Sequence, residues 1–198
     1  GPYKRTRVGT FVPSPLPHIH AALDYLLRTG ATNASGLFLD AGSGDARVVA
    51  LTSMVHGIPS VGVEYDEELL ERSMQHMEKL APLRAQGGAP MTILPGDFTD
   101  DETYLRAGLR FSDFTTVYNY INNESAIAEK ISKQSRPGTK YLLFGAFQVL
   151  EYWGLTLEQN LELVSDPDTP DIVVVESRPY TKESFIDPNA TYVQVYRR

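Results

Sequence analysis

The sequence predicts an α/β fold in which helices cover both faces of a mostly parallel sheet. Short apolar runs alternate with stretches of helical periodicity, which is typical of repeated strand–helix units. Such units are connected by right-handed crossovers, so that successive strands lie parallel. The length of 198 residues suits one domain with a full core and a ligand cleft.

The strands are predicted from apolar runs bounded by Gly or polar residues. These runs cover residues 36–40, 60–64, 91–94, 114–120 and 140–144, with two later runs at 171–176 and 192–196. Because no clear helix separates the last two runs, we expect them to form an antiparallel pair that closes one edge of the sheet.

The helices are predicted from apolar residues at helical spacing. A Pro-rich segment, 12–17, is an opening loop, because prolines can start a helix but cannot continue one. The helix that follows carries Ile19, Ala22, Leu23 and Leu26 on one face. Further helices are expected over 47–56, where Gly57 ends the pattern, over 69–80, around 127–131 and near 155–163.

Charge and composition exclude several classes of function. The 18 basic and 25 acidic residues give a net charge of −7, opposite in sign to that of proteins that bind nucleic-acid phosphates, so we expect no nucleic-acid partner. The absence of Cys excludes disulfides, thiolate zinc sites and a Cys nucleophile. The four His residues lack a metal-ligand spacing, so no metal site is expected.

We expect one domain over residues 11–198, preceded by a short segment over residues 1–10. Gly1 and Pro2 resemble the remnant of a cleaved expression tag, and a short basic stub follows them. No apolar run approaches the roughly 20 residues that span a bilayer, and no signal peptide opens the chain. We therefore expect a cytoplasmic protein, whose contact with a membrane would come through a missing N-terminal segment or a membrane-protein substrate.

Residues 40–47 carry the strongest functional signal. They read Asp40-Ala41-Gly42-Ser43-Gly44-Asp45-Ala46-Arg47 and join a strand to a helix, where the backbone N–H groups of a glycine turn can approach a polar ligand. The dinucleotide fingerprint G-x-G-x-x-G/A needs a small residue where Arg47 stands, which disfavours NAD. The acid-led D/E-x-G-x-G-x-G loop of S-adenosylmethionine enzymes fits better, with Asp40 at its head and Ala46 at its third Gly.

Acidic residues also follow the next two strands. Glu64 stands 20 residues after Gly44, where a carboxylate can accept both ribose hydroxyls. Asp97 can accept from an adenine amino group, and Phe98 offers an apolar face. The carboxyl ends of parallel strands meet at one crevice, which predicts an adenosine-cofactor site there; the alternative is that Glu64 and Asp97 only cap the following helices. The expected cofactor-binding residues are Asp40, Gly42, Ser43, Gly44, Glu64, Tyr65, Asp97, Phe98 and Asn119.

These motifs resemble those of the class I S-adenosylmethionine-dependent methyltransferases. Residues 40–46 resemble the first motif of the family, 63–64 its second and 96–98 its third. Residues 136–139 are similar to the turn before its fifth strand, and 192–196 to its antiparallel last strand. The resemblance implies a three-layer α-β-α sandwich with a seven-stranded, mostly parallel sheet, S-adenosyl-L-methionine as cofactor, and methyl transfer.

A narrower resemblance concerns the acceptor. Residues 11–15 and 44–47 resemble the Y-V-P-[TS]-P and G-D-G-R patterns of archaeal protein-lysine methyltransferases and of enzymes that methylate lysine in the ATP-synthase c-subunit, with Phe11 and Ala46 as departures. This implies methyl transfer to nitrogen, with a protein lysine as first acceptor. A small-molecule acceptor, or a catalytically silent cofactor-binding module that serves a partner protein, are the alternatives. The acidic net charge suits a basic protein or peptide.

The family resemblance places the acceptor over the end of the fourth predicted strand. Asn119 can accept from an amine through its side-chain carbonyl, and aromatic rings can hold an ammonium group. We therefore predict Asn119, Tyr118 and Tyr120 as catalytic residues. The alternative for the two tyrosines is an ordinary place on one face of a strand. Trp153 is a second acceptor-side candidate, with a role as packing anchor as its alternative.

Overall fold

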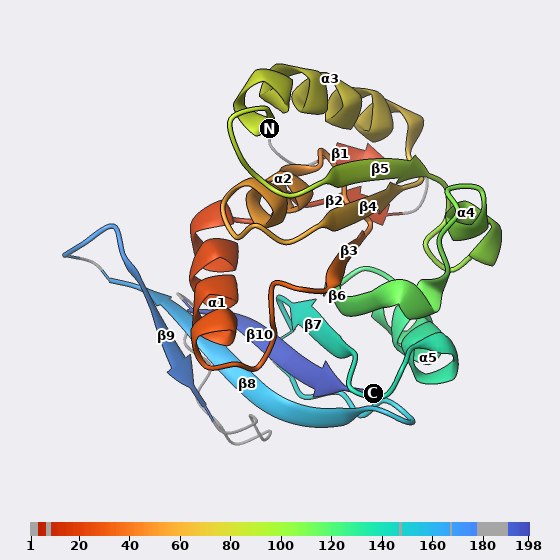
Figure 1. Ribbon diagram of the computed structural model, residues 1–198. Helices are drawn as coiled ribbons and strands as arrows, with labels where there is room; N and C mark the ends of the chain where they lie inside the picture. Colours follow the sequence, from red (N-terminus) through yellow and green to blue (C-terminus); the bar gives the residue numbers. More distant parts are fainter. Residues whose placement is uncertain (1–3, 7–8, 147, 167, 178–189) are drawn as a thin grey trace.

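A twisted sheet forms the middle layer of the protein, with helices on both of its faces (Figure 1). The computed structural model describes residues 4–6, 9–146, 148–166, 168–177 and 190–198. Within them the sheet has eight strands in the order β5-β4-β3-β6-β7-β10-β8-β9. The strands are β3 (Leu37–Ala41), β4 (Ser60–Glu64), β5 (Met91–Pro95), β6 (Phe114–Tyr120), β7 (Lys140–Phe144), β8 (Thr156–Ser165), β9 (Ile172–Glu176) and β10 (Ala190–Arg197).

The first five of these strands pair with one another in parallel, as the sequence predicted. β3 pairs with β4 and β6, β4 pairs with β5, and β6 pairs with β7, all in parallel. The last strand, β10, is antiparallel to both β7 and β8. The α/β class, the mostly parallel sheet and the antiparallel last strand are therefore confirmed, and the carboxyl ends of the parallel strands lie at one edge of the sheet.

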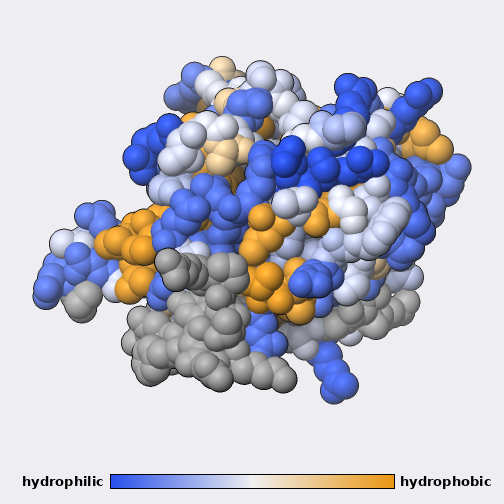
Figure 2. Space-filling model, turned by 90° about the horizontal axis from the view of Figure 1, so that it is seen from below, coloured by the Kyte–Doolittle hydropathy of each residue, from blue (hydrophilic) through white to orange (hydrophobic). Residues whose placement is uncertain are grey.

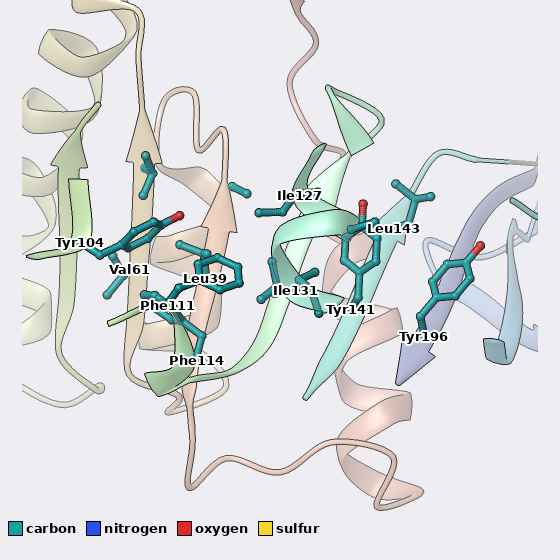
Figure 3. Close-up of a cluster of buried hydrophobic side chains, with 14 of the residues drawn as sticks. Leu39, Val61, Tyr104, Phe111, Phe114, Ile127, Ile131, Tyr141, Leu143 and Tyr196 are labelled. Atoms are coloured by element: carbon teal, nitrogen blue, oxygen red, sulfur yellow. The ribbon is translucent and has the colours of Figure 1, made fainter. Parts of the chain in front are cut away.

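Three helices lie on one face of the sheet and two on the other. The first three are α1 (Leu16–Arg28), α2 (Arg47–Met54) and α3 (Glu67–Arg84), and the other two are α4 (Asp101–Leu105) and α5 (Glu124–Gln134). Figure 3 shows the core beneath α5, where Ile127 and Ile131 lie close to Leu39, Tyr141 and Leu143 of the sheet. A second cluster joins α1 to the opposite face, and a third lies under α2 and α3.

The helix expected near 155–163 is wrong: this segment is strand β8. Its apolar side chains follow a period of two, in which Leu161 and Leu163 are buried and Glu162 between them is partly exposed. β8 pairs with β10 along one side and with β9 along the other. The two late strands that were expected to pair with each other therefore lie on either side of β8, and the sheet has one strand more than the seven expected.

A small antiparallel hairpin precedes α1. It consists of β1 (Lys4–Thr6) and β2 (Gly9–Phe11), with Arg5 opposite Thr10. The described part of the basic stub is thus paired backbone, and it leads directly into the Pro-rich loop. Ser14 in this loop is buried, so that the loop is fixed against the sheet at the carboxyl ends of the strands.

Figure 2 shows the face seen from below, where hydrophilic residues cover much of the surface and hydrophobic residues gather in a few patches. Trp153 is 84% exposed, so the packing role considered for this residue is wrong. None of the described helices has both the length and the apolar character needed to cross a membrane.

Candidate functional site

Two adjoining cavities form one crevice at the carboxyl ends of the central strands. The main cavity has a volume of about 490 Å³ and lies over the ends of β3 and β6. The side cavity, about 60 Å³, lies over the end of β4. The two share Thr10, Phe11, Gly42 and Asn122, so the hairpin and the loop after β3 border both.

The loop after β3 is a turn that needs left-handed backbone at three alternate positions. The φ angles are +88° at Gly42, +56° at Gly44 and +67° at Ala46. The N–H groups of Gly42 and Ser43 both donate to the carbonyl of Val63, at 3.0 and 2.9 Å, which attaches the turn to β4. Glycine has no steric penalty in this region, whereas Ala46 adopts it at a cost.

Phe11 covers this turn from the hairpin side. A Cβ atom at Gly44 would lie 2.2 Å from Cε2 of Phe11, so the turn and the ring approach each other as closely as a glycine allows. At Gly42 a Cβ would instead meet Asn122 and Phe98 at ordinary contact distances of 3.6 and 3.8 Å, in the space shared by the two cavities. The turn therefore leaves open backbone on the crevice side.

Glu64 holds the turn from the end of β4. Its Oε2 accepts the N–H of Gly44 at 2.7 Å, and its Oε1 accepts the N–H of Asp66 at 2.7 Å. Burial raises the pKa of this carboxyl group, and the backbone hydrogen bonds oppose that shift. Glu64 lines the side cavity together with Tyr65 and Phe98, as expected for residues that bind one adenosine.

Asp40, the last residue but one of β3, borders the main cavity as a buried carboxyl group. Burial raises its pKa well above the usual range, and the neighbouring carboxylates of Glu64 and Asp45 raise it further. Burial also tends to raise the pKa of Asp45, but the hydrogen bond and ion pair with Arg47 outweigh this effect and lower the pKa of that group. Oδ1 of Asp45 lies 2.8 Å from Nε of Arg47. Asp45 is thus a neutralised charge, whereas Asp40 faces the cavity without a cation beside it among the described residues.

Tyr118 and Tyr120 point from one face of β6 into the main cavity. The hydroxyl of Tyr118 lies 3.0 Å from Oγ of Ser14, and both rings pack against Phe144. Burial raises the pKa of the Tyr118 hydroxyl well above its usual value. The two tyrosines therefore lie on the same face of β6, and this face borders the cavity. A shared face was expected whether the tyrosines are catalytic residues or ordinary residues of the strand.

Asn119 lies on the opposite face of β6 and is fully buried. Its Nδ2 donates to the carbonyls of Ala41 at 2.9 Å and Asn122 at 3.1 Å, and its Oδ1 accepts the N–H of Asn122 at 3.3 Å. Its amide thus connects the end of β3 to the loop after β6. Asn119 is not among the residues that line either cavity.

Asp97 is exposed, and its Oδ1 accepts from both the N–H and the hydroxyl of Thr99 at 2.7 Å. It lines neither cavity. The structure therefore brings together most of the predicted site residues in one crevice, whereas Gly44, Asp97 and Asn119 lie outside its lining. Those bordering the crevice are Asp40, Gly42, Ser43, Glu64, Tyr65, Phe98, Tyr118 and Tyr120.

Sequence reasoning did not single out Asn122 and Ile121, which follow β6. Asn122 lines both cavities, and Ile121 lines the main one, is 45% exposed and has a φ of +23°. A positive φ is strained for a β-branched residue. The signal for both was their place directly after a central strand, where loops of parallel sheets build ligand sites.

The crevice fits an adenosine cofactor in two respects. The open backbone at Gly42 lines the side cavity together with the carboxylate of Glu64 and the ring of Phe98, which suit ribose hydroxyls and a base. Ser43 Oγ is buried and has no hydrogen-bond partner among the described residues. Those residues hold no group of three or more His, Cys, Asp or Glu side chains that could bind a metal ion.

Comparison by sequence identifies no relative: no family model matches the chain, and no curated protein does.

Comparison by structure finds many similar folds. An RNA methyltransferase from Salinibacter ruber, solved with S-adenosyl-L-homocysteine, is 18% identical, with a TM-score of 0.56 over 94% of this chain and 93% of that one. The rRNA methyltransferase aviRa from Streptomyces viridochromogenes is 10% identical, with a TM-score of 0.59 over 94% and 86%. A precorrin-6y C5,15-methyltransferase from Geobacter metallireducens is 12% identical, with a TM-score of 0.55 over 89% and 85%. The chain therefore has the fold of these methyltransferases.

Proposed function

We propose that this chain is an S-adenosylmethionine-dependent methyltransferase that methylates nitrogen, with a protein lysine as its first acceptor. The observation that carries the proposal is the glycine turn held by Glu64 at the strand ends, next to a cavity bordered by Tyr118 and Tyr120. The solved structures of the same fold support the cofactor, since one of them contains S-adenosyl-L-homocysteine.

In this proposal the side cavity holds the adenosine part of the cofactor. Glu64 accepts from the ribose hydroxyls, and Phe98 and Tyr65 lie against the base. The open backbone of Gly42 and the hydroxyl of Ser43 border the path toward the main cavity, where the buried carboxyl group of Asp40 faces the cationic end. Asp97 would reach the adenine amino group after its side chain leaves Thr99.

The bound cofactor supplies a methyl group already activated on a sulfonium. The residues of the chain align the acceptor, exclude water and hold the acceptor lone pair toward the methyl group. The rings of Tyr118 and Tyr120 can hold an ammonium group at the main cavity by cation–π contact. After the nitrogen has lost a proton, it attacks the methyl group, and S-adenosyl-L-homocysteine is the leaving group. Asn119 acts here by positioning the loop after β6, because its amide is engaged with the backbone on both sides.

The acceptor that we propose is a protein lysine, and its alternatives are RNA and a small amine. The net charge of −7 favours a basic protein or peptide over a polyanion. Two of the similar folds belong to RNA methyltransferases, so RNA is included in the test although the sequence predicted no nucleic-acid partner. The test also covers a small amine as acceptor and a chain that binds the cofactor without catalysis.

The proposal is tested in two steps with the full chain. Calorimetric titration with S-adenosyl-L-homocysteine and with NAD measures cofactor choice, with Gly42→Val as the variant that blocks the crevice. Labelled S-adenosylmethionine is then supplied with lysine-rich peptides, total RNA or small amines, and the product is located by mass spectrometry. Methylated lysine supports the proposal. Methylated RNA or a small amine overturns the acceptor, binding without transfer indicates the silent module, and absence of binding overturns the function.

A further inference from the structure

A second cavity, outside the crevice, lies between α2 and α3. It is a groove of about 440 Å³ whose walls are almost entirely carbon. Figure 1 shows the two helices as neighbours on one side of the sheet. The apolar walls consist of Leu16, Ala46, Ala50, Leu51, Met54, Val55, Met77 and Leu80. Val55 is 59% exposed, which leaves apolar surface in water as long as the groove is empty.

Four polar residues line this groove, and two of them are cationic. They are Arg47, His76 and Lys79, with Asp45 as the single acid among the described lining residues. Asp45 is neutralised by Arg47, and its backbone carbonyl lies 2.9 Å from Nδ1 of His76. Lys79 is exposed at the rim. With Arg47 and Asp45 paired, Lys79 supplies the positive charge at the edge of this apolar groove, on a chain whose net charge is −7.

We propose that this groove binds a single unbranched fatty acid, with the chain between α2 and α3 and the carboxylate beside Lys79. The apolar walls suit an alkyl chain, and Met54 and Met77 can adapt to it because thioether side chains are flexible. The volume lies within the range of small-molecule sites. The carboxylate gains a charge-assisted hydrogen bond at the rim, which a neutral or cationic amphiphile does not.

Occupation of the groove is expected to act on the crevice through the loop after β3. Asp45 and Arg47 line both the groove and the main cavity. These two residues therefore separate a ligand in the groove from a ligand in the crevice. A coupling between the two sites is reciprocal, so a ligand that changes the affinity of the other site by some factor has its own affinity changed by the same factor. This second part rests on the proposed function, whereas binding of the fatty acid does not.

The test measures binding of dodecanoate to the full chain by calorimetry, below its micellar concentration, with dodecyltrimethylammonium as the cationic amphiphile of equal chain length. We expect one site per chain and binding of the cation at least about tenfold weaker. Lys79→Glu should weaken dodecanoate binding about tenfold or more. Lys133→Glu makes the same charge change on α5, on the other face of the sheet, and should leave it unchanged.

A second pair of variants tests whether the alkyl chain of the fatty acid lies in the groove. Ala50→Trp fills the groove and should abolish binding, with Ala126→Trp on α5 as its control; Ala50→Leu is the milder filling variant if the larger one does not fold. The proposal is overturned if both amphiphiles bind equally well, or if a filling variant that folds still binds dodecanoate. It is also overturned if the wild type forms a dimer that the filling variant does not, because a second copy of the protein would then occupy the groove.

The coupling is measured by titrating S-adenosyl-L-homocysteine with and without saturating dodecanoate. A change in its Kd, matched by the reciprocal change in the Kd of dodecanoate, supports the shared wall. An unchanged Kd overturns the coupling. If dodecanoate binds and S-adenosyl-L-homocysteine does not, the proposed function fails while the fatty-acid site stands.

Discussion

Oε2 of Glu64 accepts the backbone N–H of Gly44 at 2.7 Å, so a side chain at the end of β4 fixes the turn after β3. The other oxygen of the same carboxylate accepts the N–H of Asp66 at the start of the next segment. One carboxylate therefore holds the backbone at two strand ends. Glu64 therefore preorganises the crevice, and in the proposed function the same residue also binds the cofactor.

Glu64→Gln is expected to weaken binding of S-adenosyl-L-homocysteine about tenfold or more. The amide keeps one oxygen and places an NH2 group toward a backbone N–H, which leaves a buried donor unpaired at a cost of about 1–3 kcal/mol. Calorimetric titration measures the affinity, and thermal unfolding checks the fold. Glu67→Gln, at an exposed position in the first turn of α3, is the control. Equal affinities for wild type and Glu64→Gln would remove Glu64 from the site.

Asp40→Asn is expected to change how stability depends on pH. Burial raises the pKa of Asp40 above its reference value of 3.8, so the folded state binds more protons than the unfolded chain between that value and the raised pKa. The free energy of unfolding therefore falls as pH rises through this window, by up to about 1.4 kcal/mol for each unit of the shift. Asparagine does not titrate and should remove this loss.

Urea unfolding between about pH 4 and about pH 8 measures this difference. The wild type should lose stability relative to Asp40→Asn as pH rises, and the two should converge toward acid pH. Burial lowers the pKa of His56, which adds a loss of stability on the acid side in both proteins, so only their difference reports on Asp40. Parallel pH profiles would show that Asp40 is ionised at no cost.

Most of the crevice could be predicted because its residues lie where local patterns end. β3 is followed directly by Gly42, β4 ends at Glu64, and parallel topology brings such strand ends together. β8 could not be predicted in this way: Leu157 and Leu161 also fit helical spacing, and the pairing with β10 that decides for a strand comes from the far end of the chain.

The acceptor side was predicted less well for two physical reasons. Side chains alternate along a strand, so Asn119 cannot face the cavity that Tyr118 and Tyr120 line, and this alternation was readable from the sequence. The contact of Phe11 with the turn at Gly44 could not be predicted from the sequence, because it depends on how the hairpin before α1 folds back over the crevice.

Asn119→Ala is expected to lower the free energy of unfolding by about 1–3 kcal/mol, because the carbonyls of Ala41 and Asn122 lose their shared donor. Affinity for S-adenosyl-L-homocysteine should fall as well, since Asn122 lines both cavities. Urea unfolding and calorimetry measure the two effects. Loss of turnover with stability and affinity unchanged would instead support the catalytic role that the sequence predicted for Asn119.

Gly44→Ala is expected to destabilise the fold and to weaken cofactor binding for two separable reasons. The new Cβ would lie 2.2 Å from the Phe11 ring, and the φ of +56° costs an L-residue about 1–2 kcal/mol. Gly57→Ala carries the second cost alone, because its φ is +67° and nothing lies within 4 Å of the added Cβ.

A double-mutant cycle between Gly44→Ala and Phe11→Ala, followed by urea unfolding, separates the two costs. In the Phe11→Ala background the cost of Gly44→Ala should fall to that of Gly57→Ala, because the backbone term remains and the clash is gone. In the wild-type background it should exceed that of Gly57→Ala. If the two costs are equal there, the ring moves aside freely, and Phe11 does not fix the turn on which the crevice is built.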